Sequence, residues 1–234
     1  MDAVVLSCEH GGNHVPPKYR DSFRDAEQVL ASHRGWDPGS LEVAQAFQRS
    51  TGAPLVSSTV TRLLVELNRS EGHANHFSQY TRDLPAETKR TINDQYYSPH
   101  RAAVQEAVER VRASGKRVIH LALHSFTPEL DGEIRTAEIG LLYDPGRPGE
   151  KKFCAAWRTR LIALHANMRV RLNYPYLGKA DGLTTSLRKK YSDAQYVGIE
   201  LEVNQRLVTQ DDAWQALIAD LAQTFLTGVR PAVG

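Results

Sequence analysis

The chain has 234 residues, of which 41% are hydrophobic and 24% charged. That is enough to bury one sizeable core, so we expect a single domain over residues 1–234. The 29 basic and 27 acidic residues leave a net charge of +2 and form no basic stripe. This pattern argues against nucleic acid or an anionic membrane as a partner.

Other features of the sequence indicate the cellular compartment. The two cysteines do not suggest a disulfide framework. The N-terminus lacks the basic region and the long apolar run of a signal peptide. No stretch approaches the roughly 18 apolar residues of a membrane span. We therefore expect a reduced, cytoplasmic protein.

Strands and helices are predicted in alternation along the chain. Short apolar runs predict strands over residues 3–8, 55–58, 63–67, 118–123, 139–143, 170–172 and 197–203. Apolar spacing and end signals predict helices over residues 38–50, 99–114, 151–167 and 212–226. The polar segment 72–91 is predicted to be a loop, and 174–191 a loop with a short helix. This alternation predicts a three-layer α/β/α domain with a largely parallel mixed sheet.

Polar side chains at the ends of apolar strands predict the position of a site, because ligands in open α/β sheets bind outside the carboxyl ends of the strands. His10 follows the first strand and precedes two glycines, which let the backbone turn tightly beside a ligand. His124 has the same placement after residues 118–123. A catalytic zinc site needs three protein ligands and one open position, and these histidines would supply two. Either histidine alone is also explained as a structural or exposed side chain.

A carboxylate is the expected third ligand, and Glu9, Asp37 and Glu202 are the candidates. Asp37 is also explained as the N-cap of the helix predicted from Pro38. Glu9 alternates with His10 along the strand end, which favours a side chain that points away. The pattern leaves this choice open.

Glu200 and Glu202 lie on one face of the strand predicted over residues 197–203, since side chains alternate along a strand. Carboxylates in an apolar strand are costly unless paired. One interpretation is a general base that acts on water at a metal. The other is an edge strand with one face in solvent.

Basic and amide side chains indicate a binding site for a carboxylate. Asn68 and Arg69 are adjacent, with Arg62 shortly before them. Arginine binds carboxylates bidentately, and asparagine adds a directional donor. For any one arginine, a surface salt bridge is the simpler explanation. Arg188, in the glycine-bearing loop, is a further candidate for the same role.

Several motifs together resemble the N-formylglutamate amidohydrolase family. The segment Ser7-Cys8-Glu9-His10-Gly11-Gly12 with Pro16 is similar to the family's opening motif. In family order there follow Asp37 at the first helix, Glu66-Leu67-Asn68-Arg69, Tyr97 with His100, His124-Ser125, and Ile199-Glu200-Leu201-Glu202. The matches span almost the whole chain, and their order and spacing are more specific than any one of them.

The resemblance implies a zinc-dependent amidohydrolase that cleaves the amide bond of an N-formyl or N-acyl amino acid. Because the family is similar to zinc carboxypeptidases and aspartoacylase, it also implies a carboxypeptidase-like fold. One zinc ion per chain would bind His10 and His124. Asp37 is favoured as the third ligand over Glu9 or Asn13, since the family shows an acid there more regularly.

The resemblance also implies roles for the other candidates. Glu202 would be the general base, and Arg62 would help to stabilise the oxyanion. Asn68, Arg69 and Arg62 would form the clamp for the carboxylate of a small-molecule substrate, with Arg188 as a further candidate. Two departures stand out: Asn13 occupies the position where the carboxypeptidase zinc motif has Glu, and Glu66 replaces the family's usual Asp.

Two other functions fit the same residues. The first is an aspartoacylase- or carboxypeptidase-like hydrolase of another N-acyl amino acid or of a peptide. The second is a metal-free module that binds small carboxylates through Arg62, Asn68 and Arg69. Metal content and the width of the pocket distinguish them.

Overall fold

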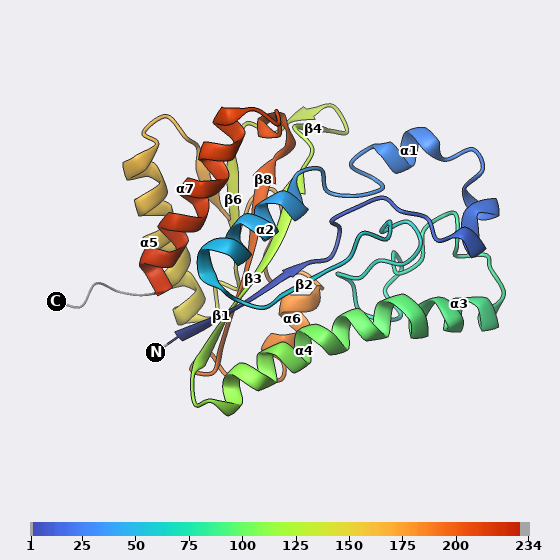
Figure 1. Ribbon diagram of the computed structural model, residues 1–234, viewed down its shortest axis with the longest axis horizontal. Helices are drawn as coiled ribbons and strands as arrows, with labels where there is room; N and C mark the ends of the chain where they lie inside the picture. Colours follow the sequence, from blue (N-terminus) through green and yellow to red (C-terminus); the bar gives the residue numbers. More distant parts are fainter. Residues whose placement is uncertain (1, 230–234) are drawn as a thin grey trace.

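The computed structural model describes residues 2–229 and shows a six-stranded sheet between two layers of helices (Figure 1). The strand order is β2-β1-β3-β8-β6-β7. Four strands are parallel: β1 (Asp2–Cys8), β2 (Leu55–Ser57), β3 (Arg117–Phe126) and β8 (Tyr196–Asn204). The strand β6 (Ile139–Leu142) is antiparallel to β8 and parallel to β7 (Val170–Leu172). This mixed, mostly parallel sheet with flanking helices confirms the predicted fold class.

Helices cover both faces of the sheet. The helices α2 (Ser40–Thr51), α5 (Pro148–Leu164) and α7 (Asp212–Val229) pack on one face, and α4 (Ser98–Ala113) and α6 (Leu183–Arg188) on the other. Since both faces are buried, the central strands are rich in apolar residues, which is why their runs were recognisable in the sequence. Among the described residues, no helix has the length and apolar character that a membrane crossing needs.

Two sequence predictions are wrong in this region. The helix α2 begins at Ser40 with Gly39 as its N-cap, in a left-handed conformation (φ +81°), so Asp37 does not cap it. Residues 63–67 form buried turns in place of a strand. Their apolar side chains pack against Tyr19 and Ile92, and such a buried turn shows the same short apolar run as a strand.

Several short elements were not predicted. The first two are η1 (Pro17–Phe23) and α1 (Glu27–Ala31). The expected loop 72–91 contains most of a third helix, α3 (Ala86–Ile92). This helix continues through a π-helical turn, η2 (Asn93–Tyr97), into α4. A hairpin of β4 (Glu129–Leu130) and β5 (Glu133–Ile134) and a 3-10 turn, η3 (Gln205–Leu207), complete the set. The hairpin had a readable signal, because Asp131-Gly132 at its turn both have positive φ.

Residues 9–36 and 58–97 form a separate apolar cluster beyond the carboxyl end of β1. In Figure 1 this part, with α1 and α3, lies on the opposite side of the sheet from α5. It covers the edge of the sheet at which β1 and β3 end. The polar side chains that follow these strands are therefore enclosed.

A buried histidine links three strands of the sheet, β1, β3 and β8. His120 on β3 contacts the Ser7 hydroxyl through Nε2 at 2.8 Å and the Tyr196 hydroxyl through Nδ1 at 2.7 Å. Burial lowers the pKa of His120 from 6.5 to about 4, since a charge without an acidic partner is costly inside the protein. The imidazole is therefore neutral in the folded protein at pH 7.

We predict that His120 makes the protein less stable in mild acid. In the unfolded chain His120 takes up a proton below about pH 6.5, but in the folded chain only near pH 4, so acid favours unfolding between these values. Urea unfolding of wild type and His120→Asn at pH 7.5 and pH 5 measures this. The stability of wild type relative to the variant should fall by about 2 kcal/mol over that interval. If the difference in unfolding free energy between wild type and the variant were the same at both pH values, this prediction would be wrong.

Candidate active site

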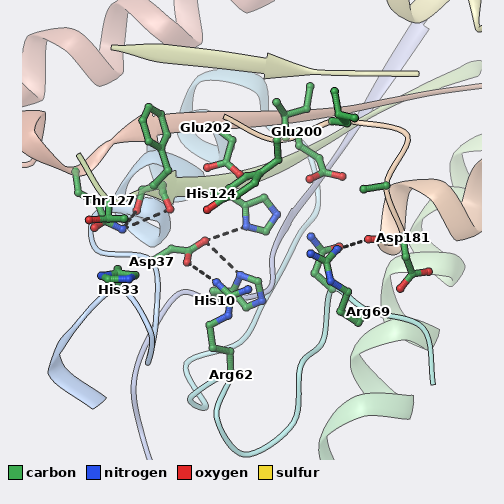
Figure 2. Close-up of a pocket in the computed structure, with 18 residues that line it drawn as sticks. His10, His33, Asp37, Arg62, Arg69, His124, Thr127, Asp181, Glu200 and Glu202 are labelled. Carbon is green, nitrogen blue, oxygen red and sulfur yellow. Dashed lines mark hydrogen bonds and ion pairs between the residues drawn. The ribbon is translucent and has the colours of Figure 1, made fainter. Parts of the chain in front are cut away.

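The ends of β1 and β3 bring three predicted residues together. His10 lies two residues beyond β1, and His124 is on β3 opposite Glu202 of β8. One ligand atom each from His10, Asp37 and His124 lies within 4.8 Å of the others, and all three residues are buried. Figure 2 shows these side chains converging on one point of a pocket.

The Asp37 carboxylate is shared between three neighbours. Its Oδ2 lies 3.2 Å from Nδ1 of His10 and 3.0 Å from Nδ1 of His124. Its Oδ1 accepts a hydrogen bond of 3.0 Å from Nη1 of Arg62. Although burial opposes the charge, His10, His124 and Arg62 hold the pKa of Asp37 far below its usual value. Asp37 is therefore an anion at the centre of the site.

Backbone contacts place Asp37 in this position. Its N–H donates to the His10 carbonyl at 2.9 Å, and its own carbonyl accepts from the N–H of Ser40 at 3.1 Å. The Ser125 hydroxyl donates to the carbonyl of Pro38 at 2.7 Å. The turn before α2 is thus attached both to the end of β1 and to β3.

The second nitrogen of each imidazole faces another buried carboxylate. Nε2 of His10 contacts Oε1 of Glu66, and Nε2 of His124 lies 3.2 Å from Oε2 of Glu9. The other Glu9 oxygen lies 3.4 Å from Nε2 of His100. Metal-binding histidines in proteins characteristically contact a carboxylate or carbonyl through the nitrogen that does not bind the metal. The orientation of both rings fits this pattern.

The donor set fits a divalent metal ion. Two imidazole nitrogens and one carboxylate oxygen are the ligands that a catalytic zinc site uses, with one position left for water or substrate. The group His10, Asp37 and His124 could therefore bind a metal. Glu9 lies behind His124, and Asn13 donates to the carbonyl of Leu30 at 3.1 Å. Neither belongs to the converging group.

The pocket has a volume of about 180 Å³ and joins these residues to both carboxylates of β8, Glu200 and Glu202. Burial raises the pKa of Glu202 to about 8, and the charges of Asp37 and Glu200 add to this effect. One Glu202 oxygen, Oε2, is buried without a hydrogen-bond partner among residues 2–229. This atom is available to a ligand of the pocket.

Three predicted polar residues also line the pocket: Arg62, Asn68 and Arg69. The Arg62 guanidinium donates to Glu66 through Nε and Nη2, at 2.9 and 2.7 Å, as well as to Asp37. Oδ1 of Asn68 accepts from the N–H of Leu183 at 2.8 Å. Nη1 of Arg69 donates to the Asp181 carbonyl. Each side chain keeps further N–H groups, since arginine has five and the asparagine amide two.

Arg188 is not brought to this pocket. It is buried on α6, where its Nε lies 3.0 and 3.1 Å from the two carboxylate oxygens of Glu150. Its Nη2 donates to the Gly198 carbonyl at 2.7 Å. These contacts join α6 to α5 and β8, so the structure gives Arg188 a place in the protein core in place of the predicted substrate contact.

Other pocket residues were not predicted from the sequence. His33, Thr127, Tyr176 and Gln205 line the pocket and come from loops and from η3. Glu9 was considered as a metal ligand and Glu66 only as part of a family motif, and the contacts of both with the histidines were not predicted. Ring orientation depends on tertiary packing, and no local pattern reports it.

Comparisons with known proteins identify the family to which the chain belongs. Residues 2–209 match the family model described as N-formylglutamate amidohydrolase. The chain therefore belongs to the N-formylglutamate amidohydrolase family, and this membership supports an amidohydrolase that acts on N-formyl amino acids.

Two solved structures are similar over almost the whole chain. Gene product Atu2144 from Agrobacterium tumefaciens is 27% identical, with a TM-score of 0.83 over 96% of this chain and 89% of that one. N-formylglutamate amidohydrolase from Ralstonia eutropha JMP134 is 20% identical, with a TM-score of 0.69 over 98% and 94%. This second likeness shows the fold alone. A search of curated proteins gave no significant match.

We predict that Arg62→Ala destabilises the protein by about 2–4 kcal/mol. The variant leaves two buried carboxylates, Asp37 and Glu66, without their guanidinium partner, and breaking a buried ion pair is costly. The control is Arg24→Ala, which removes a pair with Asp21 whose side chains are 75% and 86% exposed; it should cost at most about 1 kcal/mol. Urea unfolding measures both. Equal effects would show that Arg62 does not hold these carboxylates.

Proposed function

We propose that the protein is a zinc-dependent amidohydrolase that cleaves the amide bond of an N-formyl amino acid such as N-formylglutamate. The observation that carries this proposal is the convergence of His10, Asp37 and His124 beside Glu202 in one pocket. Family membership supplies the reaction class. The predicted further likeness to zinc carboxypeptidases and aspartoacylase remains a prediction.

His10, Asp37 and His124 would hold the zinc ion. When bound, zinc supplies Lewis acidity toward water and toward the formyl carbonyl. Glu66 and Glu9 orient the two imidazoles through their second nitrogens, which fixes the nitrogen that each ring offers to the metal.

Glu202 is the proposed general base. Its carboxylate lies in the pocket with Oε2 free of hydrogen bonds within residues 2–229. In its ionised form, which a bound zinc ion would favour, it takes a proton from the attacking water and delivers it to the leaving nitrogen, which departs as the amine of the amino acid. The enclosed position of Glu202 keeps bulk water from competing for this proton.

Arg69 and Asn68 are the proposed contacts for the substrate carboxylate. Both line the pocket and keep N–H groups that are not used in their contacts with Asp181 and Leu183. Arg62 uses three N–H groups on Asp37 and Glu66. The other two N–H groups of Arg62 lie in the plane of the guanidinium, which these contacts hold in place. They are the proposed donors to the oxyanion.

A panel of N-formyl and N-acetyl amino acids tests the reaction class. Formate or acetate release and the amine product are measured with purified, untagged protein in zinc-containing buffer. Release from N-formyl-L-glutamate or another N-formyl amino acid is the expected result. Tight binding of the amino acid derivatives without turnover would instead favour the module that binds small carboxylates.

We predict that His10→Ala and His124→Ala each lower the bound zinc well below that of wild type and abolish hydrolysis, because each removes one ligand of three. Metal analysis after dialysis and formate release are the measurements. The control is His165→Ala: this histidine contacts Asp220 at 2.9 Å outside the pocket and should leave both quantities unchanged. If either of the two pocket variants keeps full zinc and activity, the proposed metal site is wrong.

We predict that Glu202→Gln keeps its zinc and loses about 100-fold or more in kcat, since glutamine cannot accept the water proton. The matched control is Glu133→Gln, which removes a carboxylate from the exposed hairpin strand β5. Single-turnover formate release and metal analysis are measured on both. A kcat for Glu202→Gln within a few fold of wild type would remove Glu202 from the role of base.

A further inference from the structure

Six carboxylates are buried in the described residues, and they fall into two groups. Four contact an imidazole or guanidinium nitrogen: Glu9, Asp37, Glu66 and Glu150. The other two, Glu200 and Glu202, have no such ion pair within residues 2–229. Buried charges in proteins are normally paired. Since both unpaired carboxylates line the pocket, a ligand that donates hydrogen bonds or carries positive charge is expected there.

Glu202 has a role in the proposed reaction, but Glu200 does not. Glu200 lies on the same face of β8, two residues before Glu202, and is 9% exposed. The Thr184 hydroxyl of α6 donates to its Oε1 at 2.6 Å. One carboxylate oxygen is thereby held in place, and Oε2 remains for a ligand.

The start of α6 ties Glu200 to the proposed carboxylate contact. Oδ1 of Asn68 accepts from the N–H of Leu183, the residue next to Thr184. Asn68 and Glu200 are therefore both hydrogen-bonded to the first turn of α6, which fixes their positions relative to each other. In Figure 2, Glu202 projects toward the cluster of His124 and Asp37, and Glu200 is drawn on the side of the pocket that contains Arg69.

We propose that Glu200 binds the nitrogen of the substrate: its carboxylate accepts the N–H of the scissile amide and, after cleavage, the ammonium group of the released amino acid. This inference rests on the proposed function and deepens it. Water adds its hydroxyl to the formyl carbon, the C–N bond breaks, and the nitrogen gains a proton through Glu202. A second proton from solvent gives the ammonium, whose positive charge pairs with Glu200.

The inference defines the class of substrate. An α-amino acid would lie with its carboxylate on Arg69 and Asn68 and its nitrogen on Glu200, so that the formyl group reaches the cluster of His10, Asp37 and His124. Amides without an N–H, such as N-formyl derivatives of N-methyl amino acids or proline, would leave Glu200 without its partner. They should be poor substrates, because an unpaired buried carboxylate is costly.

Product binding tests the inference. Calorimetry compares L-glutamate with L-2-hydroxyglutarate, which has a hydroxyl in place of the ammonium, in wild type, Glu200→Gln and the control Glu133→Gln. Wild type and the control should prefer glutamate by about tenfold or more, as for a charge-assisted hydrogen bond. In Glu200→Gln this preference should fall to about twofold or less. The same preference in all three proteins would overturn the proposal.

A second variant covers the case in which Glu200→Gln does not fold. Thr184→Val removes the hydroxyl that holds Glu200 but keeps the carboxylate, so the preference for glutamate should fall only part of the way. An unchanged preference in a folded Thr184→Val protein would argue against this placement of Glu200. Formate release by wild type is measured separately. Its absence would overturn the proposed function, whereas release without an ammonium preference would overturn only the role of Glu200.

Discussion

The arrangement of the whole site depends on the shared Asp37 carboxylate. It accepts contacts from the loop after β1, from β3 and from the buried turn that contains Arg62. A buried anion is tolerated only where several donors surround it, so these three segments are tied to one another. Each donor also contacts a second carboxylate: Glu66 contacts both His10 and Arg62, and Glu9 contacts His124.

The sheet supplies the rest of the geometry. Since β1, β3 and β8 are parallel neighbours, residues at their carboxyl ends meet at one edge. The loop of residues 173–182 follows β7, and its residues Tyr176, Leu177, Ala180 and Asp181 line the same pocket. Close packing fixes this loop, because a Cβ at Gly140 would lie 1.8 Å from the Tyr174 carbonyl oxygen, and one at Gly178 would lie 2.1 Å from the Tyr143 nitrogen. Only glycine fits at either position.

Much of the fold and of the candidate site was predictable from the strands and the residues that follow them. Little was predictable from the segments between the strands. The buried strands were visible as apolar runs, and the residues after them, His10 and His124, were candidates for that reason. Asp37 was ambiguous, because a carboxylate before a proline also reads as a helix cap. The turns at residues 63–67 and the partners of Arg188 depend on tertiary contacts. A guanidinium in a buried ion pair and one in a ligand site have the same local sequence signal.

The signs of the charges in the pocket separate the hydrolase from a simple binder of carboxylates. A binder would gain from Arg69 and Arg62 but would be opposed by Glu200, and by Glu202 in its ionised form, since both line the same pocket of about 180 Å³. Like charges repel more strongly inside a protein than in water. A ligand with a carboxylate at one end and an amide nitrogen beside it uses both kinds of group. An N-acyl amino acid has this pattern, and hydrolysis strengthens it, because the amide N–H becomes an ammonium while the carboxylate is unchanged.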